Sequence, residues 1–361
     1  LSSTKKLLFC CLVFVVHYNE LLDMFLNEEL IIKPEYQRLF RWSIGQQSRF
    51  IESLILEMPV PPIYVIEIEE GVYELIDGLQ RISTYLHFRG RHPDRKGALT
   101  LTDCDIVPEL NGLTFESLPR ALEIKLKRNF IRVEVLRKES DQRLRYYMFK
   151  RLNTGGERLS EQEIRNSTIR LLSNEFNSFI IRLSEDPNFK NCISNVSEEK
   201  IEQKYDQELV LRFFAFKNYR ENYEHEVGDF LTEYMEKVSD PNNNEFEFNY
   251  DEEENIFRKT FAILNRALGD QIFSGTSNKG NFVSRFLAYH FEAFCIGIQP
   301  YLDILDENNE FQMGKLGELF TAIKNDPEFK KITTGGGKNY AKPLDARITF
   351  VSEKLRDVEW T

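Results

Sequence analysis

Two short apolar runs separated by Glu69-Glu70-Gly71 constrain the fold of this chain more than any other feature. Residues 63–68 (IYVIEI) and 72–77 (VYELID) are rich in β-branched and aromatic side chains, and the three residues between them favour a turn. The pattern therefore predicts a β-hairpin. Gly78 follows at once and allows a sharp change of backbone direction. Residues 79–88 then place apolar side chains at helical spacing, so a strand–turn–helix unit is expected.

The polar residues of this junction suit an anionic ligand. Asp77 ends the second strand, and Gln80 and Arg81 fall in the first turn of the helix. The backbone N–H groups and the dipole of a helix N-terminus attract anions, and an arginine adds a forked donor. The alternative is an ordinary strand–turn–helix junction in which Asp77 is only a cap. The geometry alone leaves both interpretations open.

A second segment lies upstream of the hairpin. Residues 34–42 (PEYQRLFRW) interleave two arginines with three aromatic side chains. Ser43 and Gln46 follow as a capping box, the pattern that opens a helix. The apolar spacing predicts that this helix continues to a stop at Pro59.

A third segment lies at residues 149–167. Here Asn153 to Gly156 precede a second capping box, formed by Ser160 and Glu163. A glycine-containing loop just before a helix can form a backbone nest that binds an anion.

Taken together, these segments resemble the N-terminal domain of the GmrSD-type restriction endonucleases, a large bacterial family. Leu79 replaces the first glutamine of the family's DGQQR motif, so a role that needs that amide does not carry over. Weaker similarity continues through residues 204–209 (KYDQEL) and extends to Arg347. The matching motifs are Tyr36-Gln37-Arg38 with Arg41 and Trp42, Pro59-Val60-Pro61-Pro62-Ile63, Asp77 to Thr84, and Arg151 to Asn166.

The resemblance implies an α+β fold. Residues 17–170 would form a domain with a small mixed β-sheet, related to the ParB and sulfiredoxin proteins. Residues 171–361 would form a mostly helical domain, with helical patterns at 169–184, 201–222, 227–238, 254–268, 281–298 and 313–324. Residues 1–16 are an apolar extension. We interpret Leu7–Val16 as a buried strand or an extension foreign to the domain, with a signal peptide as the lesser alternative because no cleavage site follows.

The resemblance also implies nucleotide binding and hydrolysis centred on the DGQQR-like motif, in a component of an anti-phage restriction system. The expected enzyme is a Mg²⁺-dependent nucleoside triphosphate phosphohydrolase. Asp77, Gln80 and Arg81 are the expected catalytic residues, and Asp77 is the expected Mg²⁺ ligand. The residues expected to bind the nucleotide are Arg38, Arg41, Gly78, Thr84, Asn153, Thr154 and Gly155.

Nuclease chemistry is expected from a partner protein. An HNH nuclease needs histidines around a metal ion, whereas the five histidines here are scattered along the chain. Two alternatives stay open. The chain could be a metal-dependent DNA nickase that uses Asp77, Glu74 and Glu163, or a non-catalytic module that senses modified phage DNA or a partner protein. The sequence leaves self-association open.

The charge is unevenly distributed. Residues 1–170 hold 25 Lys and Arg against 24 Asp and Glu, whereas the remainder holds 22 against 34, within an overall net charge of −11. This argues against sequence-independent DNA binding by the whole surface, and the acidic half would suit a basic partner. Five cysteines without a CxxC pair argue for a reducing compartment. We expect a cytoplasmic protein without a membrane partner.

Overall fold

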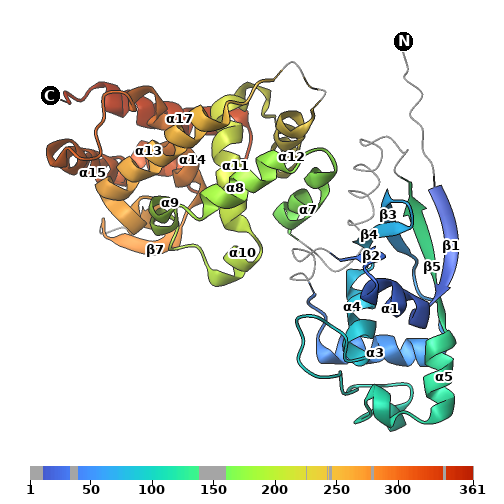
Figure 1. Cartoon of the computed structure of the whole chain (residues 1–361). Coiled ribbons are helices and arrows are strands. Elements are labelled where there is room, and N and C mark those ends of the chain that lie inside the picture. Colours follow the sequence, from blue (N-terminus) through green and yellow to red (C-terminus); the bar gives the residue numbers. More distant parts are fainter. Residues whose placement is uncertain are drawn as a thin grey trace. The chain divides into compact units, whose positions relative to one another are not determined.

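The chain divides into two compact units, residues 1–156 and 157–361. Figure 1 shows the mixed sheet of the first unit and the helices of the second, which confirms the expected α+β class. This computed structural model describes residues 11–32, 40–137, 160–224, 226–241, 243, 246–277, 280–335 and 339–360.

The first unit is built on a five-stranded sheet in the order β1-β5-β3-β4-β2. β3 and β4 form the predicted antiparallel hairpin, and β5 runs parallel to β3. The ladder pairs Tyr64 with Asp77, so Asp77 is the last residue of its strand. The strands are β1 (Cys11–His17), β2 (Leu30–Ile31), β3 (Ile63–Glu69), β4 (Val72–Asp77) and β5 (Phe130–Leu136).

In the described part of the first unit, four helices pack with this sheet in one hydrophobic core. Buried side chains of the strands, such as Val65 and Val133, share that core with Ile51, Leu86 and Leu126 from the helices. The helices are α1 (Tyr18–Leu26), α3 (Ile44–Ile55), α4 (Leu79–Phe88) and α5 (Arg120–Arg128). Two single turns of 3₁₀ helix, Pro108–Leu110 and Phe115–Ser117, lie between α4 and α5. Both the helix at 79–88 and the capping box of Ser43 with Gln46 are confirmed.

β1 is a strand, as expected, but the prediction that it is buried is wrong for alternate residues. Val16 is 3% exposed, whereas Val13 and Val15 are 50% and 58% exposed. Successive side chains of a strand point to opposite faces of the sheet, and β1 lies at the sheet edge. Only one of its faces therefore contributes to the core.

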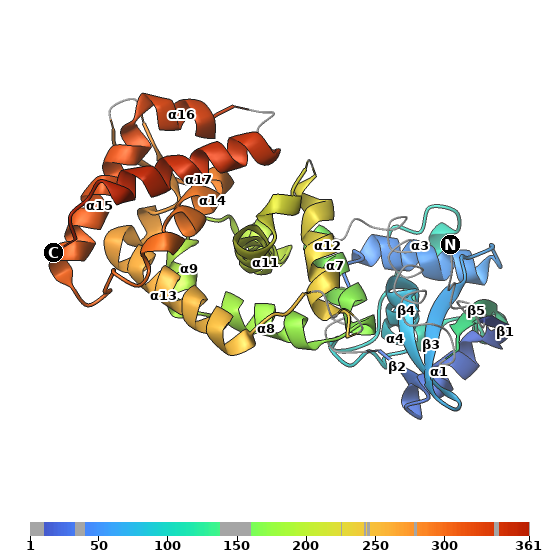
Figure 2. The ribbon, with the colours of Figure 1, turned by 90° about the horizontal axis from the view of Figure 1, so that it is seen from above.

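The second unit is an assembly of helices around α11 (Tyr205–Asn218). Figure 2 shows α11 nearly end-on, with α8, α12 and α14 around it. Its side chains are buried over most of its circumference, including Phe213, Phe214 and Phe216. The other helices are α7 (Glu161–Thr168), α8 (Glu175–Ser184), α9 (Pro187–Cys192), α10 (Glu198–Glu202), α12 (Val227–Ser239), α13 (Tyr250–Leu268), α14 (Ala288–Gly297), α15 (Glu310–Asn325), α16 (Pro327–Thr333) and α17 (Ala341–Arg356). In the residues that the structure describes, no helix is long and apolar enough to cross a bilayer.

The helix predicted over residues 281–298 is wrong in its first part. Phe282–Phe286 form strand β7, which pairs with β6 (Ser274–Thr276), and α14 begins only at Ala288. The sequence Phe-Val-Ser-Arg-Phe alternates apolar and polar side chains only imperfectly, and its aromatic and β-branched residues suit a strand. Pairing with β6 makes this segment a strand, and no pattern within residues 281–298 reveals that pairing.

A buried lysine lies inside the second unit. Lys324 is 1% exposed, and its ammonium donates to the carbonyl of Gln271. The rings of Phe282 and Phe294 lie 5.0 and 5.6 Å from its Nζ atom. No ion pair involves Lys324 within the described residues. Burial lowers the pKa of Lys324 from 10.5 to about 7.

This depressed pKa predicts that stability rises with pH. Between the folded and unfolded pKa values the unfolded chain holds one more proton than the folded chain, so alkalinisation favours folding. Between pH 7 and 9 the wild type should gain about 2 kcal/mol of unfolding free energy relative to Lys324→Met. Urea unfolding of both proteins at the two pH values measures this difference. Parallel pH profiles for the two proteins would contradict the prediction.

Candidate functional site

The junction between β4 and α4 requires a glycine. Gly78 has a φ of 108°, and a Cβ atom built on it would lie 2.4 Å from Cγ2 of the buried Ile63. Gly78, the N-cap residue of α4, carries no side chain that could cap the helix. The first-turn N–H groups of α4 therefore follow directly after Asp77, whose side chain is 33% exposed. This arrangement of a carboxylate beside an uncapped helix start is the one that the sequence predicted for an anion site.

Gly78→Ala should be strongly destabilising. The substitution forces a left-handed backbone on an L-residue and a clash on the core, so a loss of about 2–4 kcal/mol in unfolding free energy is expected. Gly71→Ala is the matched control, because Gly71 also has a positive φ of 76° but a Cβ there would meet nothing within 4 Å. The control should lose only about 1 kcal/mol. Equal losses in the two variants would show that the contact with Ile63 is unimportant.

Arg81 ties the turn to the loop before β3. Its Nη2 atom donates to Oδ2 of Asp77 at 2.7 Å. Its Nη1 atom donates to the carbonyl oxygens of Pro61 and Pro62, at 2.7 and 3.0 Å. The side chain is only 12% exposed. Arg81 therefore orients Asp77 and fixes the proline loop, a role that was not apparent from the sequence.

Gln80 holds a second loop against the start of α4. Its Oε1 atom accepts hydrogen bonds from the backbone N–H groups of Arg41 and Trp42, both at 3.1 Å. The exposed Arg41 is thereby placed beside the Asp77–Arg81 turn. The expected catalytic role of Gln80 stays a prediction, and the geometry adds a positioning role.

A buried polar chain supports the same loop from the other side. Nε2 of Gln47 donates to the carbonyl of Trp42 at 2.7 Å, and Oε1 of Gln47 accepts from Nδ1 of His87 at 2.8 Å. The rings of His87 and His92 lie 6.2 Å apart. Burial lowers the pKa of His87, and burial together with nearby His87 lowers the pKa of His92 to about 4. Both imidazoles are therefore neutral at pH 7, and this pairing of histidines was missed in the sequence.

The remaining predicted site residues are Thr84 and four residues that the structure does not describe. Thr84 is fully buried in the second turn of α4, and its hydroxyl has no hydrogen-bond partner among the described residues. Leu79, the position that departs from the family motif, packs against the hydrophobic core. Arg38, Asn153, Thr154 and Gly155 lie outside the described residues.

Asp77 offers a metal ion one protein ligand. Among the residues that the structure describes, no group of three or more His, Cys, Asp or Glu side chains is arranged to hold a metal. Mg²⁺ commonly binds through one or two carboxylates together with substrate phosphates and water. The donor set at Asp77 therefore fits a magnesium ion that arrives with a nucleotide, and does not fit a tightly held resident metal.

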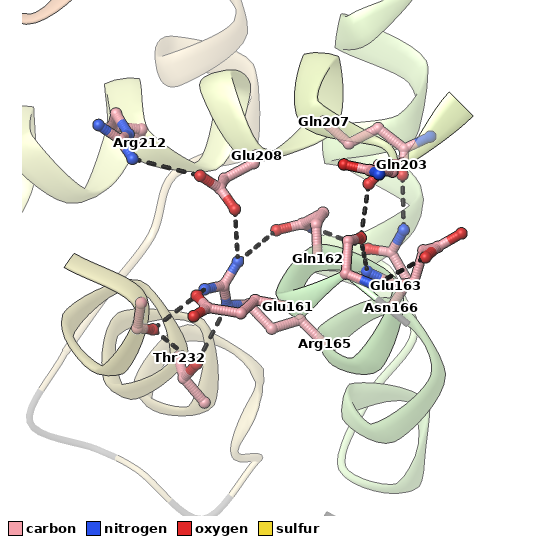
Figure 3. A network of polar contacts seen from close by, with 12 residues as sticks. Glu161, Gln162, Glu163, Arg165, Asn166, Gln203, Gln207, Glu208, Arg212 and Thr232 are labelled. Carbon is pink, nitrogen blue, oxygen red and sulfur yellow. Dashed lines mark hydrogen bonds and ion pairs between the residues drawn. The ribbon is translucent and has the colours of Figure 1, made fainter. Parts of the chain in front are cut away.

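The second capping box opens a different polar site. Ser160 and Glu163 cap α7 as predicted, and α7 also carries Arg165, which is 3% exposed. Figure 3 shows how Arg165 contacts several helices at once. Its five N–H groups donate to Thr232 Oγ1, Gln162 Oε1, Glu208 Oε2, Glu161 Oε2 and the carbonyl of Gly228, at 2.8 to 3.2 Å. Its capacity as a hydrogen-bond donor is saturated.

The network continues from Arg165 into the core of the second unit. Glu208 also accepts from Arg212 at 3.2 Å, and Arg212 donates to Glu292 at 2.7 Å. Glu292 in turn pairs with Arg347, and these last two side chains are each 1% exposed. Three stretches singled out in the sequence, the α7 motif, residues 204–209 and Arg347, thus converge in one buried ion-pair network.

Comparison with known proteins supports the resemblance over part of the chain. No curated protein and no solved structure matches the chain. A family model described as the GmrSD restriction endonuclease, N-terminal domain, matches residues 19–170. The match includes the Asp77–Arg81 turn and also α7, which packs in the second unit. Residues 19–170 of this chain are therefore similar to the N-terminal domains of GmrSD restriction endonucleases.

Proposed function

We propose that the chain binds a nucleoside triphosphate at the Asp77–Arg81 turn and hydrolyses it with Mg²⁺. As a component of an anti-phage restriction system, it would use this reaction to regulate DNA cleavage by a partner nuclease. The observation that carries the proposal is the uncapped N-terminus of α4, which directly follows a partly exposed carboxylate. The family match of this segment supports the restriction context.

The phosphate groups would lie against the first turn of α4. Backbone N–H groups at a helix N-terminus and the helix dipole favour phosphate oxygens. Arg41 would add a charged donor, since its backbone is held by Gln80 next to this turn. Arg81 is better suited to hold Asp77 than to reach the phosphates, because its Nη atoms already donate to Asp77 and the proline carbonyls.

Asp77 would hold the Mg²⁺ that accompanies the nucleotide. The ion, when bound, supplies neutralisation of the charge that develops on the phosphate oxygens. Oδ2 of Asp77 accepts from Arg81, so Oδ1 would be the oxygen offered to the ion. Phosphoryl transfer depends mostly on positioning and charge neutralisation. Asp77 and the first-turn N–H groups of α4 would position the nucleotide, and Arg41 and the ion would neutralise its charge.

Hydrolysis would license cleavage by a separate HNH-type nuclease. Phage DNA, modified or not, would be the signal that triggers turnover. Nothing in this arrangement requires the chain to cut DNA itself.

The test is phosphate release from ATP, GTP, CTP and UTP by the full chain with Mg²⁺, with and without phage DNA. Turnover of at least one nucleotide that EDTA abolishes is the expected result. The same samples are assayed for plasmid nicking. Nicking without nucleotide turnover would replace the proposal with a nickase, and binding without turnover would replace it with a sensor module.

A further inference from the structure

A closed surface loop follows α4 in the first unit. Gly90 has a φ of 64°, and a Cβ atom built on it would lie 3.6 Å from Cβ of Ala98, so the two ends of the loop approach each other. Next to these ends, the backbone N–H of Leu99 donates to the carbonyl of His87 at 3.1 Å. Compact surface loops with close ends are frequently functional. Residues 90–98 are called the basic loop below.

His92 anchors the basic loop to the body of the unit. Its side chain is buried, and its ring stacks on that of Phe40 with the centroids 5.1 Å apart. Its Nδ1 atom accepts from the backbone N–H of Asp94 at 3.1 Å. The backbone N–H of Arg91 donates to the carbonyl of Leu86 at 2.8 Å. The backbone that carries the charged side chains of this loop is therefore fixed in place.

The basic loop carries three cations against one carboxylate. Arg91, Arg95 and Lys96 are exposed, and Asp94 is the one acid among residues 90–98. Within the described part of the chain, no ion pair involves any of the three cations. A fixed cluster of uncompensated positive charge attracts polyanions.

The lysines of α5 show the opposite arrangement in the same unit. Lys125 pairs with Glu57 at 3.1 Å, and Lys127 pairs with Glu123 at 2.6 Å. These carboxylates already offset the charges of the two lysines, so a polyanion gains less by approaching them. The two sets of cations can therefore be compared directly.

The basic loop is connected to the proposed nucleotide site through Phe40. The guanidinium carbon of Arg95 lies 5.5 Å from the centre of the Phe40 ring. The next residue, Arg41, donates its backbone N–H to Gln80 in the first turn of α4. A polyanion on the basic loop would thus contact a segment that is bonded to the start of α4.

We propose that the basic loop binds the phosphate backbone of duplex DNA. The inference rests on the proposed function, in which phage DNA triggers turnover, and it adds the place where that DNA docks. That function favours DNA over an acidic protein as the polyanion. The arginines offer forked donors that match phosphate oxygens. In a chain of net charge −11, a local patch of this kind lets DNA approach one face.

The experiment is a fluorescence anisotropy titration of a labelled DNA duplex with the full chain, without nucleotide and at several salt concentrations. Replacing Arg91 and Lys96 together by Gln removes two cations and keeps Arg95 on Phe40. At about 0.1 M salt the affinity should fall at least roughly tenfold. The slope of log K against log salt should become shallower by about 2, one for each lost phosphate contact. Two duplexes of unrelated sequence should bind alike, because phosphate contacts carry no sequence information.

The matched control replaces Lys125 and Lys127 together by Gln. This variant has the same net charge as the first one, but it loses cations that are paired inside the protein. Its affinity should stay within roughly threefold of the wild type, and its salt slope within about 0.5. Both variants change exposed or half-exposed side chains, and circular dichroism checks that each one is folded.

The binding assay contains no nucleotide, so a chain that fails to hydrolyse any nucleotide can still bind DNA at this loop. The two proposals can therefore fail separately. The inference is overturned if the wild type shows no saturable binding of the duplex, or if the two double variants lose affinity equally. Binding of poly-L-glutamate without binding of the duplex would also overturn it, and would assign the loop to an acidic protein.

Discussion

Replacing Glu292 by Gln should lower the unfolding free energy by about 3–5 kcal/mol, the largest stability effect expected in this chain. Glu292 is 1% exposed and accepts from both Arg212 and Arg347. The amide keeps the shape of the side chain but removes the negative charge that two buried guanidinium groups share. Charges that lose their partner inside a protein cost far more than exposed ones, because water cannot solvate them.

The matched control is Glu353→Gln. Glu353 pairs with Arg356 at 3.8 Å, and both side chains are more than half exposed, so its loss should cost less than about 1 kcal/mol. Trp360 lies in the same unit as Glu292, and Trp42→Phe would leave its fluorescence as the only indole signal during urea unfolding. If Glu292→Gln stays within about 1 kcal/mol of the wild type, the network contributes no more than an exposed pair.

Asp77→Asn should reduce nucleotide turnover by about a hundredfold or more, because a neutral amide oxygen is a much weaker Mg²⁺ ligand than a carboxylate. The asparagine oxygen can still accept from Arg81, so the turn should keep its shape. Asp77 is one-third exposed, and the loss of its ion pair should cost less than about 1 kcal/mol of stability. The substitution should therefore lower activity without unfolding the protein. Steady-state phosphate release measures the activity, and urea unfolding measures the stability.

Glu70→Gln serves as the control for this substitution. Glu70 lies exposed in the turn of the same hairpin, and it makes no contact with the site in the described structure. Its turnover should equal that of the wild type. Wild-type turnover in Asp77→Asn would remove Asp77 from the mechanism, whereas an equal loss in both variants would point to a general charge effect.

The hairpin, α4 and the two capping boxes could be predicted because short-range patterns determine them. The β-branched runs, Gly78 and the pair of Ser43 with Gln46 each act over a few residues. Their outcomes depend little on distant parts of the chain. The same reasoning located the strand end at Asp77 and the helix start at Leu79.

The contacts that define the site could not be predicted in this way. Arg81 meets carbonyls 19 and 20 residues upstream, and Gln80 meets backbone N–H groups 38 and 39 residues upstream. Sequence reasoning assigned both side chains to the ligand, because it could not see these internal partners. The strand at Phe282–Phe286 was missed for the same physical reason, since its pairing with Ser274–Thr276 outweighs local propensity.

The convergence of Arg165, Glu208 and Arg347 is a tertiary property as well. These residues lie far apart in the sequence, so the sequence does not show that each one pairs with a buried side chain of opposite charge. A buried arginine demands a carboxylate, yet the sequence offers 58 acidic residues and no means of choosing among them. Only the packing of α7, α11, α14 and α17 identifies the pairs.

The measurement that tests the central claim most directly is photocrosslinking of the full chain with an azido-nucleoside triphosphate and Mg²⁺, followed by mass spectrometry of the labelled peptides. The base used is the one that phosphate release identifies. The account predicts labels on peptides that contain residues 40–43 or 77–84, suppressed by excess unlabelled nucleotide and by Asp77→Asn. Suppressible labelling confined to residues 160–361 would contradict it and would move the nucleotide site to the helical unit.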